Sequence, residues 1–171
     1  MSQSSDSTRF PLLLLTLLTP AVLSAQTIPA FGAGELMQLP TTNWPTNGGN
    51  LYNQRYSPLD QINRQNVGNL RGVWRARLDG SGVAPQYSGE AQPIVYDGTL
   101  YIVSGADDVF AISVDSGERL WKYEAGLDPE ITTVCCGWTS RGVGIGAGKV
   151  FVGQLDGRLV ALDANSGEVA W

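Results

Sequence analysis

The chain has 171 residues, 43 % of them apolar and 16 % charged, a composition that suits a folded domain and excludes a disordered chain. Eleven Lys and Arg against 16 Asp and Glu give a net charge of −5, which excludes a nucleic-acid partner because such surfaces need clustered cations. The absence of histidine excludes a Ser-His-Asp triad, His-containing metal sites and the c-type haem motif within this segment.

The first 25 residues have the pattern of a secretory signal peptide. Phe10–Leu23 is almost wholly apolar, and Ser24 and Ala25 are small residues of the kind found at a cleavage site. The apolar run is too short to span a bilayer. We therefore expect cleavage after Ala25, with an uncleaved anchor as the alternative, and no transmembrane span in the mature chain 26–171. Export would place that chain in the periplasm, an oxidising compartment.

The segment that follows is rich in Pro, Gly and Asn. Ser57 and Pro58 predict the start of a short helix, with serine as the N-cap and proline at the first helical position. Gly68 would end this helix, and Arg71–Leu78 is a predicted strand.

A repeat with an offset of 50 residues covers the second half of the chain. The aligned pairs are Gly98–Val103 with Gly148–Gly153, Asp115–Glu118 with Asn165–Glu168, and Trp121 with Trp171. A weaker copy ends at Trp74, 47 residues before Trp121. Such an internal period indicates a repeat architecture.

Each copy contains short strand-like runs separated by Asx-Gly and Ser-Gly pairs. These pairs supply the positive φ that tight hairpin turns require. The runs of the first copy are Ala91–Tyr96, Leu100–Val103, Val109–Ser113 and Arg119–Glu124. Four strands in about 50 residues is the content of one propeller blade. A sandwich of short hairpins is the alternative, but it does not explain the fixed tryptophan spacing.

We therefore predict an all-β fold, a β-propeller of which this chain holds about two and a half blades. Residues 92–171 should form two consecutive four-stranded antiparallel blades, with Trp121 and Trp171 at equivalent positions. Propellers close at four to eight blades, because one blade cannot bury both of its faces. We expect 26–171 to be the truncated N-terminal part of a longer propeller domain, in which Arg71–Leu78 would complete the last blade.

A glycine pattern, Gly142-x-Gly144-x-x-Ala147, matches the dinucleotide-binding motif. That motif needs a helix after it, whereas Lys149–Gly153 and Arg158–Leu162 continue as predicted strands. We expect the glycines to let a connection between blades pass close to something bulky.

The only two cysteines, Cys135 and Cys136, are adjacent. Their α-carbons lie about 3.8 Å apart across a trans peptide, which is shorter than the usual span between disulfide partners. The two possibilities are a rare vicinal disulfide, favoured by export, and two separate thiols. A vicinal ring is flat and hard, which suits a role against a ligand.

Several segments resemble quinoprotein alcohol dehydrogenases, and together they cover residues 42 to 171. The segments similar to the start of that family are Trp44–Asn50, Arg55–Asn63 and Asn66–Leu70. The pair Cys135-Cys136 followed by Arg141 resembles the vicinal disulfide and following arginine of the family. The segment Ala161–Trp171 is similar to its tryptophan-docking motif, which non-enzymatic propellers share.

The resemblance implies an eight-bladed propeller that binds pyrroloquinoline quinone (PQQ) on its axis with Ca²⁺ or a lanthanide ion. It implies oxidation of alcohols to aldehydes by hydride transfer to the quinone, with a cytochrome c as electron acceptor. Cys135 and Cys136 would form the disulfide wall, and Glu90 and Arg141 would contact the cofactor. On their residue types alone, Glu90 could instead be a solvated carboxylate at a blade edge and Arg141 a surface ion-pair partner.

The base and the metal ligands of the family are expected downstream of Trp171, so this segment should hold no catalytic or metal-ligating residue and should be inactive alone. The alternatives are a non-enzymatic propeller scaffold of the outer-membrane assembly type and an inactive truncated product. Cys135, Cys136 and Arg141 argue against the scaffold, which needs none of them.

Overall fold

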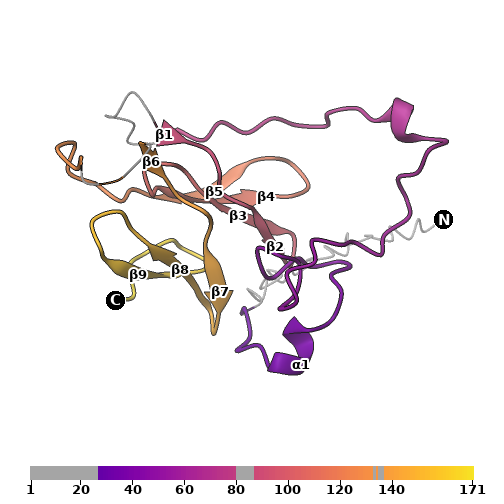
Figure 1. Ribbon diagram of the computed structural model, residues 1–171, viewed down its shortest axis with the longest axis horizontal. Coiled ribbons are helices and arrows are strands. Elements are labelled where there is room, and N and C mark those ends of the chain that lie inside the picture. The colour runs from indigo at the N-terminus through magenta and orange to yellow at the C-terminus, as the bar shows by residue number, and fades with distance from the viewer. Residues whose placement is uncertain (1–26, 80–86, 133, 135–136) are drawn as a thin grey trace, which may run out of the picture.

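The computed structural model describes residues 27–79, 87–132, 134 and 137–171 (Figure 1). The predicted signal peptide 1–25 and the pair Cys135-Cys136 lie outside the described residues. The elements, in chain order, are α1 (Ala33–Leu36), the 3₁₀ helix η1 (Val67–Asn69), β1 (Tyr87–Ser88), β2 (Ile94–Tyr96), β3 (Thr99–Val103), β4 (Val109–Ser113), β5 (Arg119–Tyr123), β6 (Trp138–Thr139), β7 (Gly144–Gly146), β8 (Lys149–Gly153) and β9 (Leu159–Asp163). The prediction of an all-β fold is confirmed.

Strands β2 to β5 form a four-stranded antiparallel sheet in which each strand pairs with the next along the chain. The β2–β3 hairpin turns at Asp97 and Gly98, whose φ angles of 47° and 72° are those that a two-residue turn requires. β4 is buried along most of its length because strands flank it on both sides and the second sheet packs nearby. This sheet is the first predicted blade.

Strands β7 to β9 repeat the first sheet at the predicted offset. Tyr101 pairs with Ala111 in the first sheet, and Phe151 pairs with Ala161 in the second. Strands rather than a helix occupy 149–163, as expected. The prediction of a second four-stranded sheet is wrong for the described residues, because the sheet has three strands. Where the fourth strand should lie, Leu162 forms an isolated bridge with Val169, and Ala161 forms backbone hydrogen bonds with Ala170 and Trp171, but these contacts do not extend into a strand.

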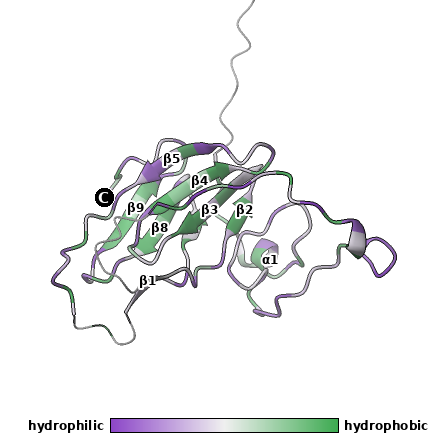
Figure 2. Ribbon diagram, turned by 90° about the horizontal axis from the view of Figure 1, so that it is seen from above, coloured by the Kyte–Doolittle hydropathy of each residue, from purple (hydrophilic) through white to green (hydrophobic). Residues whose placement is uncertain are grey.

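One hydrophobic core joins the two sheets. Its buried residues come from both: Ile94, Tyr101, Val103, Val109, Ala111 and Trp121 from the first, and Val143, Val150, Val152, Val160, Leu162 and Ala164 from the second. Figure 2 shows the hydrophobic residues concentrated on these strands. Ile28 adds to the core from the start of the described chain, where its carbonyl accepts a hydrogen bond from the N–H of Gly148.

A tryptophan of the first blade docks on a turn of the second. The indole Nε1 of Trp121 donates to the carbonyl of Ala164 at 3.0 Å. Its ring lies so close to Gly167 that an added Cβ there would come within 2.6 Å of the ring. Because Gly167 has a φ of +73° and no side chain, the turn can accept the indole.

The same docking contact occurs one repeat earlier. Trp74 Nε1 donates to the carbonyl of Val114 at 2.7 Å, and the ring would meet a Cβ on Gly117 at 2.6 Å. Trp74, which ends the weaker copy of the repeat, therefore makes the same docking contact as Trp121.

The segment before the blades departs from prediction. The structure has neither a strand over Arg71–Leu78 nor a helix starting at Ser57 and Pro58, and η1 is the only regular element between Trp44 and Leu78. A strand needs a neighbour to complete its hydrogen bonds, and here 71–78 has none beside it within the described chain. Ser57 closes a small turn instead, accepting from the N–H of Leu59 at 3.2 Å. We call residues 44–78 the arm, and Figure 1 shows that the part of the arm around η1 reaches away from the sheets.

Within the described ranges, no helix has the length and apolar character needed to cross a membrane.

Candidate functional site

Two extended segments far apart in sequence lie side by side where the chain approaches each blade. β1 and β6 pair in parallel, with Tyr87 opposite Trp138. Further along, Gln92 bridges to Gly142, and the Gln92 N–H donates to the carbonyl of Arg141 at 3.2 Å. These segments lead into β2 and β7, so the pairing brings equivalent parts of consecutive blades together.

This parallel pairing joins two of the predicted site residues. Arg141 Nη2 lies 3.3 Å from Glu90 Oε2, with side chains that are 81 % and 48 % exposed. An ion pair this exposed contributes little to stability, since water competes for both charges. The contact agrees with both expectations for Arg141, a surface ion pair and a cofactor contact, because its partner is the other predicted site residue.

The structure contains a buried carboxylate, Asp107, that the sequence did not indicate. Asp107, in the β3–β4 turn, accepts from the N–H of Leu155 at 2.7 Å. Burial raises the pKa of Asp107, and the hydrogen bond from Leu155, together with the nearby Ser140 side chain, opposes that rise. The alignment of the repeats held a signal for this residue, because Asp107 stands where the second copy has Gly157.

The other two predicted site residues, Cys135 and Cys136, lie outside the described residues, so their pairing and their distance from Arg141 stay predictions. Among the residues that the structure describes, no group of three or more acidic or cysteine side chains is arranged to hold a metal ion.

The glycine pattern that matched the dinucleotide motif adopts no such structure. Gly144 lies in β7, and the chain continues into β8 rather than a helix. Gly142 has a φ of +143°, and a Cβ there would come within 2.7 Å of Asn47 Nδ2. The expected close approach is therefore found at Gly142, whereas Gly144 has open space around it.

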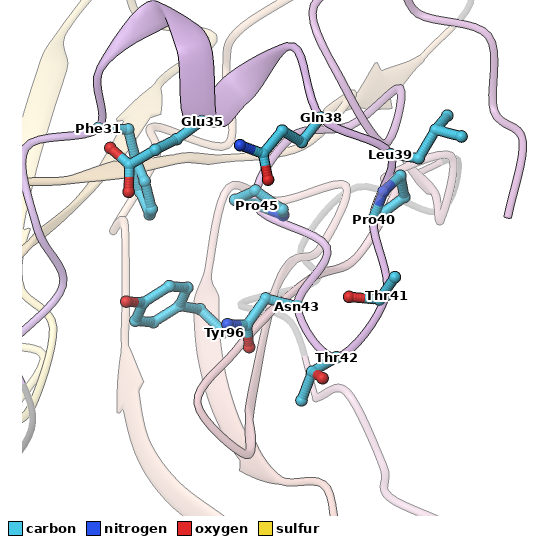
Figure 3. Close-up of a pocket in the computed structure, with 10 residues that line it drawn as sticks. All are labelled: Phe31, Glu35, Gln38, Leu39, Pro40, Thr41, Thr42, Asn43, Pro45 and Tyr96. Carbon is cyan, nitrogen blue, oxygen red and sulfur yellow. The ribbon is translucent and has the colours of Figure 1, made fainter. Parts of the chain in front are cut away.

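A separate hollow of about 310 Å³ lies between the α1 region and β2 (Figure 3). It is lined by Phe31, Glu35, Gln38, Leu39, Pro40, Thr41, Thr42, Asn43, Pro45 and Tyr96, and includes none of the predicted site residues. Its carboxylate, Glu35, accepts from the N–H of Gly32 at 2.9 Å and so caps α1. The hollow lies at the Tyr96 end of β2, whereas Glu90 precedes the opposite end.

Comparison with known proteins places the sheets in a larger architecture. The family described as glucose/ethanol/alcohol dehydrogenase, beta-propeller domain, matches residues 44–170. The quinoprotein alcohol dehydrogenase PedH of Pseudomonas putida is 38 % identical over 168 residues, which cover 96 % of this chain and 28 % of the relative. A 1-butanol dehydrogenase (cytochrome c) of Thauera butanivorans is 45 % identical over 134 residues, covering 75 % of this chain and 18 % of the relative. The chain thus spans less than a third of either relative.

Solved structures give the same result. The quinohemoprotein alcohol dehydrogenase ADHIIG of Pseudomonas putida HK5 superposes with a TM-score of 0.77 at 38 % identity, over 86 % of this chain and 21 % of that one. A europium-containing methanol dehydrogenase superposes with a TM-score of 0.68 at 30 % identity, over 81 % of this chain and 24 % of that one. The two sheets therefore correspond to part of a β-propeller.

Proposed function

Since the chain belongs to the PQQ-dependent alcohol dehydrogenase family of β-propeller proteins, we propose that it is the N-terminal part of an exported dehydrogenase that oxidises alcohols to aldehydes. The domain would begin at residue 26, after a periplasmic signal peptide over 1–25. The observation that carries the proposal is the convergence of Glu90 and Arg141, two residues 51 positions apart that were assigned to one cofactor site from sequence.

The chemistry of these two residues fits PQQ, a planar quinone with three carboxylates. A guanidinium offers five N–H donors in a fixed plane, which suits carboxylate and carbonyl oxygens. The Arg141 side chain is 81 % exposed, so its donors face solvent rather than the core. Glu90 approaches that fork through Nη2.

Bound PQQ would supply the two-electron acceptor for alcohol oxidation. Arg141 would place a fixed cation beside the quinone carbonyls, where it stabilises the negative charge that develops on oxygen. Glu90 would contact the cofactor and orient the guanidinium through the 3.3 Å ion pair. Cys135 and Cys136, joined as a vicinal disulfide, would provide a flat wall against the cofactor plane.

The remaining parts of the reaction would come from outside this chain. We propose Ca²⁺ or a lanthanide ion as the metal, with its ligands and the catalytic base in the other blades of the closed propeller. A cytochrome c is the proposed electron acceptor, in keeping with the relative named 1-butanol dehydrogenase (cytochrome c).

The test is Arg141→Ala in the full-length dehydrogenase, reconstituted with PQQ and metal. We expect kcat to fall by about 10²-fold or more, because removing one electrostatic partner of a developing oxyanion costs about that much. Quinone retention should fall less, since the charge matters most as the reaction proceeds.

Arg119→Ala is the matched control, because Arg119 is also an exposed arginine, with 49 % of its side chain accessible, and lies near a carboxylate, Asp79, at 4.0 Å. The control should leave kcat unchanged. Unaltered turnover of Arg141→Ala with quinone bound would contradict the proposed site.

A further inference from the structure

The start of the arm is anchored on β2 of the first blade. The N–H of Trp44 donates to the carbonyl of Val95 at 2.7 Å, and the N–H of Val95 donates to the carbonyl of Trp44 at 3.1 Å. Because this bridge is antiparallel, the chain after Trp44 runs back toward the residues that precede β2. Asn47 is thereby brought close to Gln92, and both residues line one cavity of about 420 Å³.

Asn47 also contacts Gly142, the residue that follows Arg141. An ideal Cβ on Gly142 would lie 2.7 Å from Nδ2 of Asn47, 3.0 Å from Oδ1 and 3.1 Å from Cγ. The carboxamide therefore occupies the space that a side chain at position 142 would need. The φ of Gly142, +143°, is also one that residues with a side chain rarely adopt. Glycine at 142 thus permits both this backbone conformation and the packing of Asn47 on it.

The backbone that Asn47 contacts is the one that carries Arg141. The carbonyl of Arg141 accepts a hydrogen bond from the N–H of Gln92 at 3.2 Å, and Gln92 and Gly142 form a parallel bridge. The guanidinium of Arg141 contacts Glu90 at 3.3 Å. The peptide group between Arg141 and Gly142 is therefore held by a hydrogen bond at its carbonyl, and the carboxamide of Asn47 packs on the glycine that ends it.

We propose that Asn47 is a positioning residue for Arg141: its carboxamide packs on Gly142 and, together with the hydrogen bond from Gln92, fixes the backbone from which the guanidinium reaches the cofactor site. The inference rests on the proposed function for its catalytic consequence, whereas the contact itself lies within this chain. Such packing can affect a reaction from a distance, because a misplacement of about 1 Å can cost roughly 10²-fold in rate.

The first experiment measures hydrogen exchange on the full-length protein without quinone. In Asn47→Ala, the Gln92 amide, which donates to Arg141, should exchange about fivefold faster or more, as expected when about 1 kcal/mol of local stability is lost. Asn66→Ala is the matched control, because the Asn66 carboxamide bonds within the arm, to the carbonyl of Gln61 and the N–H of Asn63. Wild-type exchange in Asn47→Ala, or equal acceleration in both variants, would overturn the inference.

The second experiment tests the packing by compensation, in the reconstituted dehydrogenase. Gly142→Ala should lower kcat by about tenfold or more with KM for the alcohol unchanged, because the new Cβ displaces the backbone next to Arg141. Adding Asn47→Ala should restore part of this kcat, since it removes the three atoms that the Cβ would meet. A double variant no faster than Gly142→Ala would overturn the inference.

The third experiment asks whether Asn47 acts through Arg141. Asn47→Ala should lower kcat in the wild-type protein, but Asn47→Ala combined with Arg141→Ala should be no slower than Arg141→Ala alone. Losses that multiply would show that Asn47 acts by another route and would overturn the inference.

Failure of this inference and failure of the proposed function are distinguishable. A protein that binds no PQQ but shows the exchange pattern contradicts the proposed function and supports the link between Asn47 and Arg141. An active dehydrogenase without that pattern contradicts the link alone.

Discussion

Asp107 is a buried carboxylate for which desolvation and hydrogen bonding act in opposite directions. Burial disfavours its charged form, whereas the N–H of Leu155 and the side chain of Ser140 favour it, and the balance leaves the pKa of Asp107 above its ordinary value. The nearby carboxylates of Asp156 and Asp108 raise the pKa in the same direction as burial. The stability of this region should therefore depend on pH.

We expect Asp107→Asn to remove a pH-dependent loss of stability. In the folded protein Asp107 keeps its proton at pH values where the unfolded chain, with an aspartate pKa of about 3.9, has lost it. The free energy of unfolding therefore declines as pH rises from that value through the raised folded pKa. Urea unfolding of wild type and variant at a series of pH values checks this. The prediction would be contradicted if the free energy of unfolding changed with pH in the same way for wild type and variant between the unfolded and the folded pKa of Asp107.

The cofactor roles of Glu90 and Arg141 stay predictions from the family resemblance, and the contact between the two residues could not be predicted from the sequence. No local pattern shows that segments 87–92 and 138–142 run in parallel, because the pairing joins residues about 50 positions apart that lie outside the repeated turns. The sequence does not indicate a buried role for Asp107, because its setting, Gly105-Ala106-Asp107-Asp108, has the composition of an exposed turn. Burial by the neighbouring blade gives it a different role.

For the strands of the blades, the local sequence is sufficient to predict where each strand begins. Each predicted strand of the first blade is found within three residues of its expected start, because Asx-Gly and Ser-Gly pairs fix where one strand ends and the next begins. The strand predicted over Arg71–Leu78 is not found, because a strand needs a partner strand and none of the described residues forms one beside it. Trp74 nevertheless docks on Gly117, so this docking contact forms without a regular strand.

Two glycines of the second blade allow two contributions to stability to be measured separately: the free-energy cost of a left-handed backbone conformation and the contribution of tryptophan docking. Gly157 and Gly167 both have positive φ, but a Cβ on Gly157 would meet no atom within 4 Å, whereas one on Gly167 would meet Trp121 at 2.6 Å. Gly157→Ala should lower the free energy of unfolding by about 1–2 kcal/mol, the cost of a left-handed residue.

Gly167→Ala should cost about 1–3 kcal/mol more, because it also displaces the indole. Equilibrium urea unfolding of the two variants in the full-length protein gives the difference. Equal costs would show that the docking contact contributes nothing.

The blades described here present apolar surface that a closed propeller would cover. On the second sheet and the residues after it, Leu159, Val169 and Trp171 are each close to 60 % exposed. In the arm, Tyr52, Ile62 and Val73 are 64 %, 60 % and 89 % exposed. In repeat folds such surfaces are buried by neighbouring repeats, and exposed strand edges promote association.

We expect the isolated segment 26–171 to be poorly soluble and to unfold without a sharp transition. It should also show no alcohol oxidation with added PQQ and Ca²⁺, because the base and metal ligands are proposed to lie in other blades. Calorimetry and a turnover assay on the purified segment check both outcomes. A cooperative melt of a monomeric sample would contradict the first, and measurable turnover the second.

The docking contact also bears on how such a molecule can arise by gene duplication. The first blade carries both a tryptophan for the repeat after it, Trp121, and a glycine turn for the repeat before it, Gly117. A duplicated copy therefore arrives with both complementary surfaces and can be inserted without changing its neighbours. Because such head-to-tail contacts form a ring only when the rotation per copy closes the circle, the rotation from one blade to the next determines how many duplications end in a complete protein.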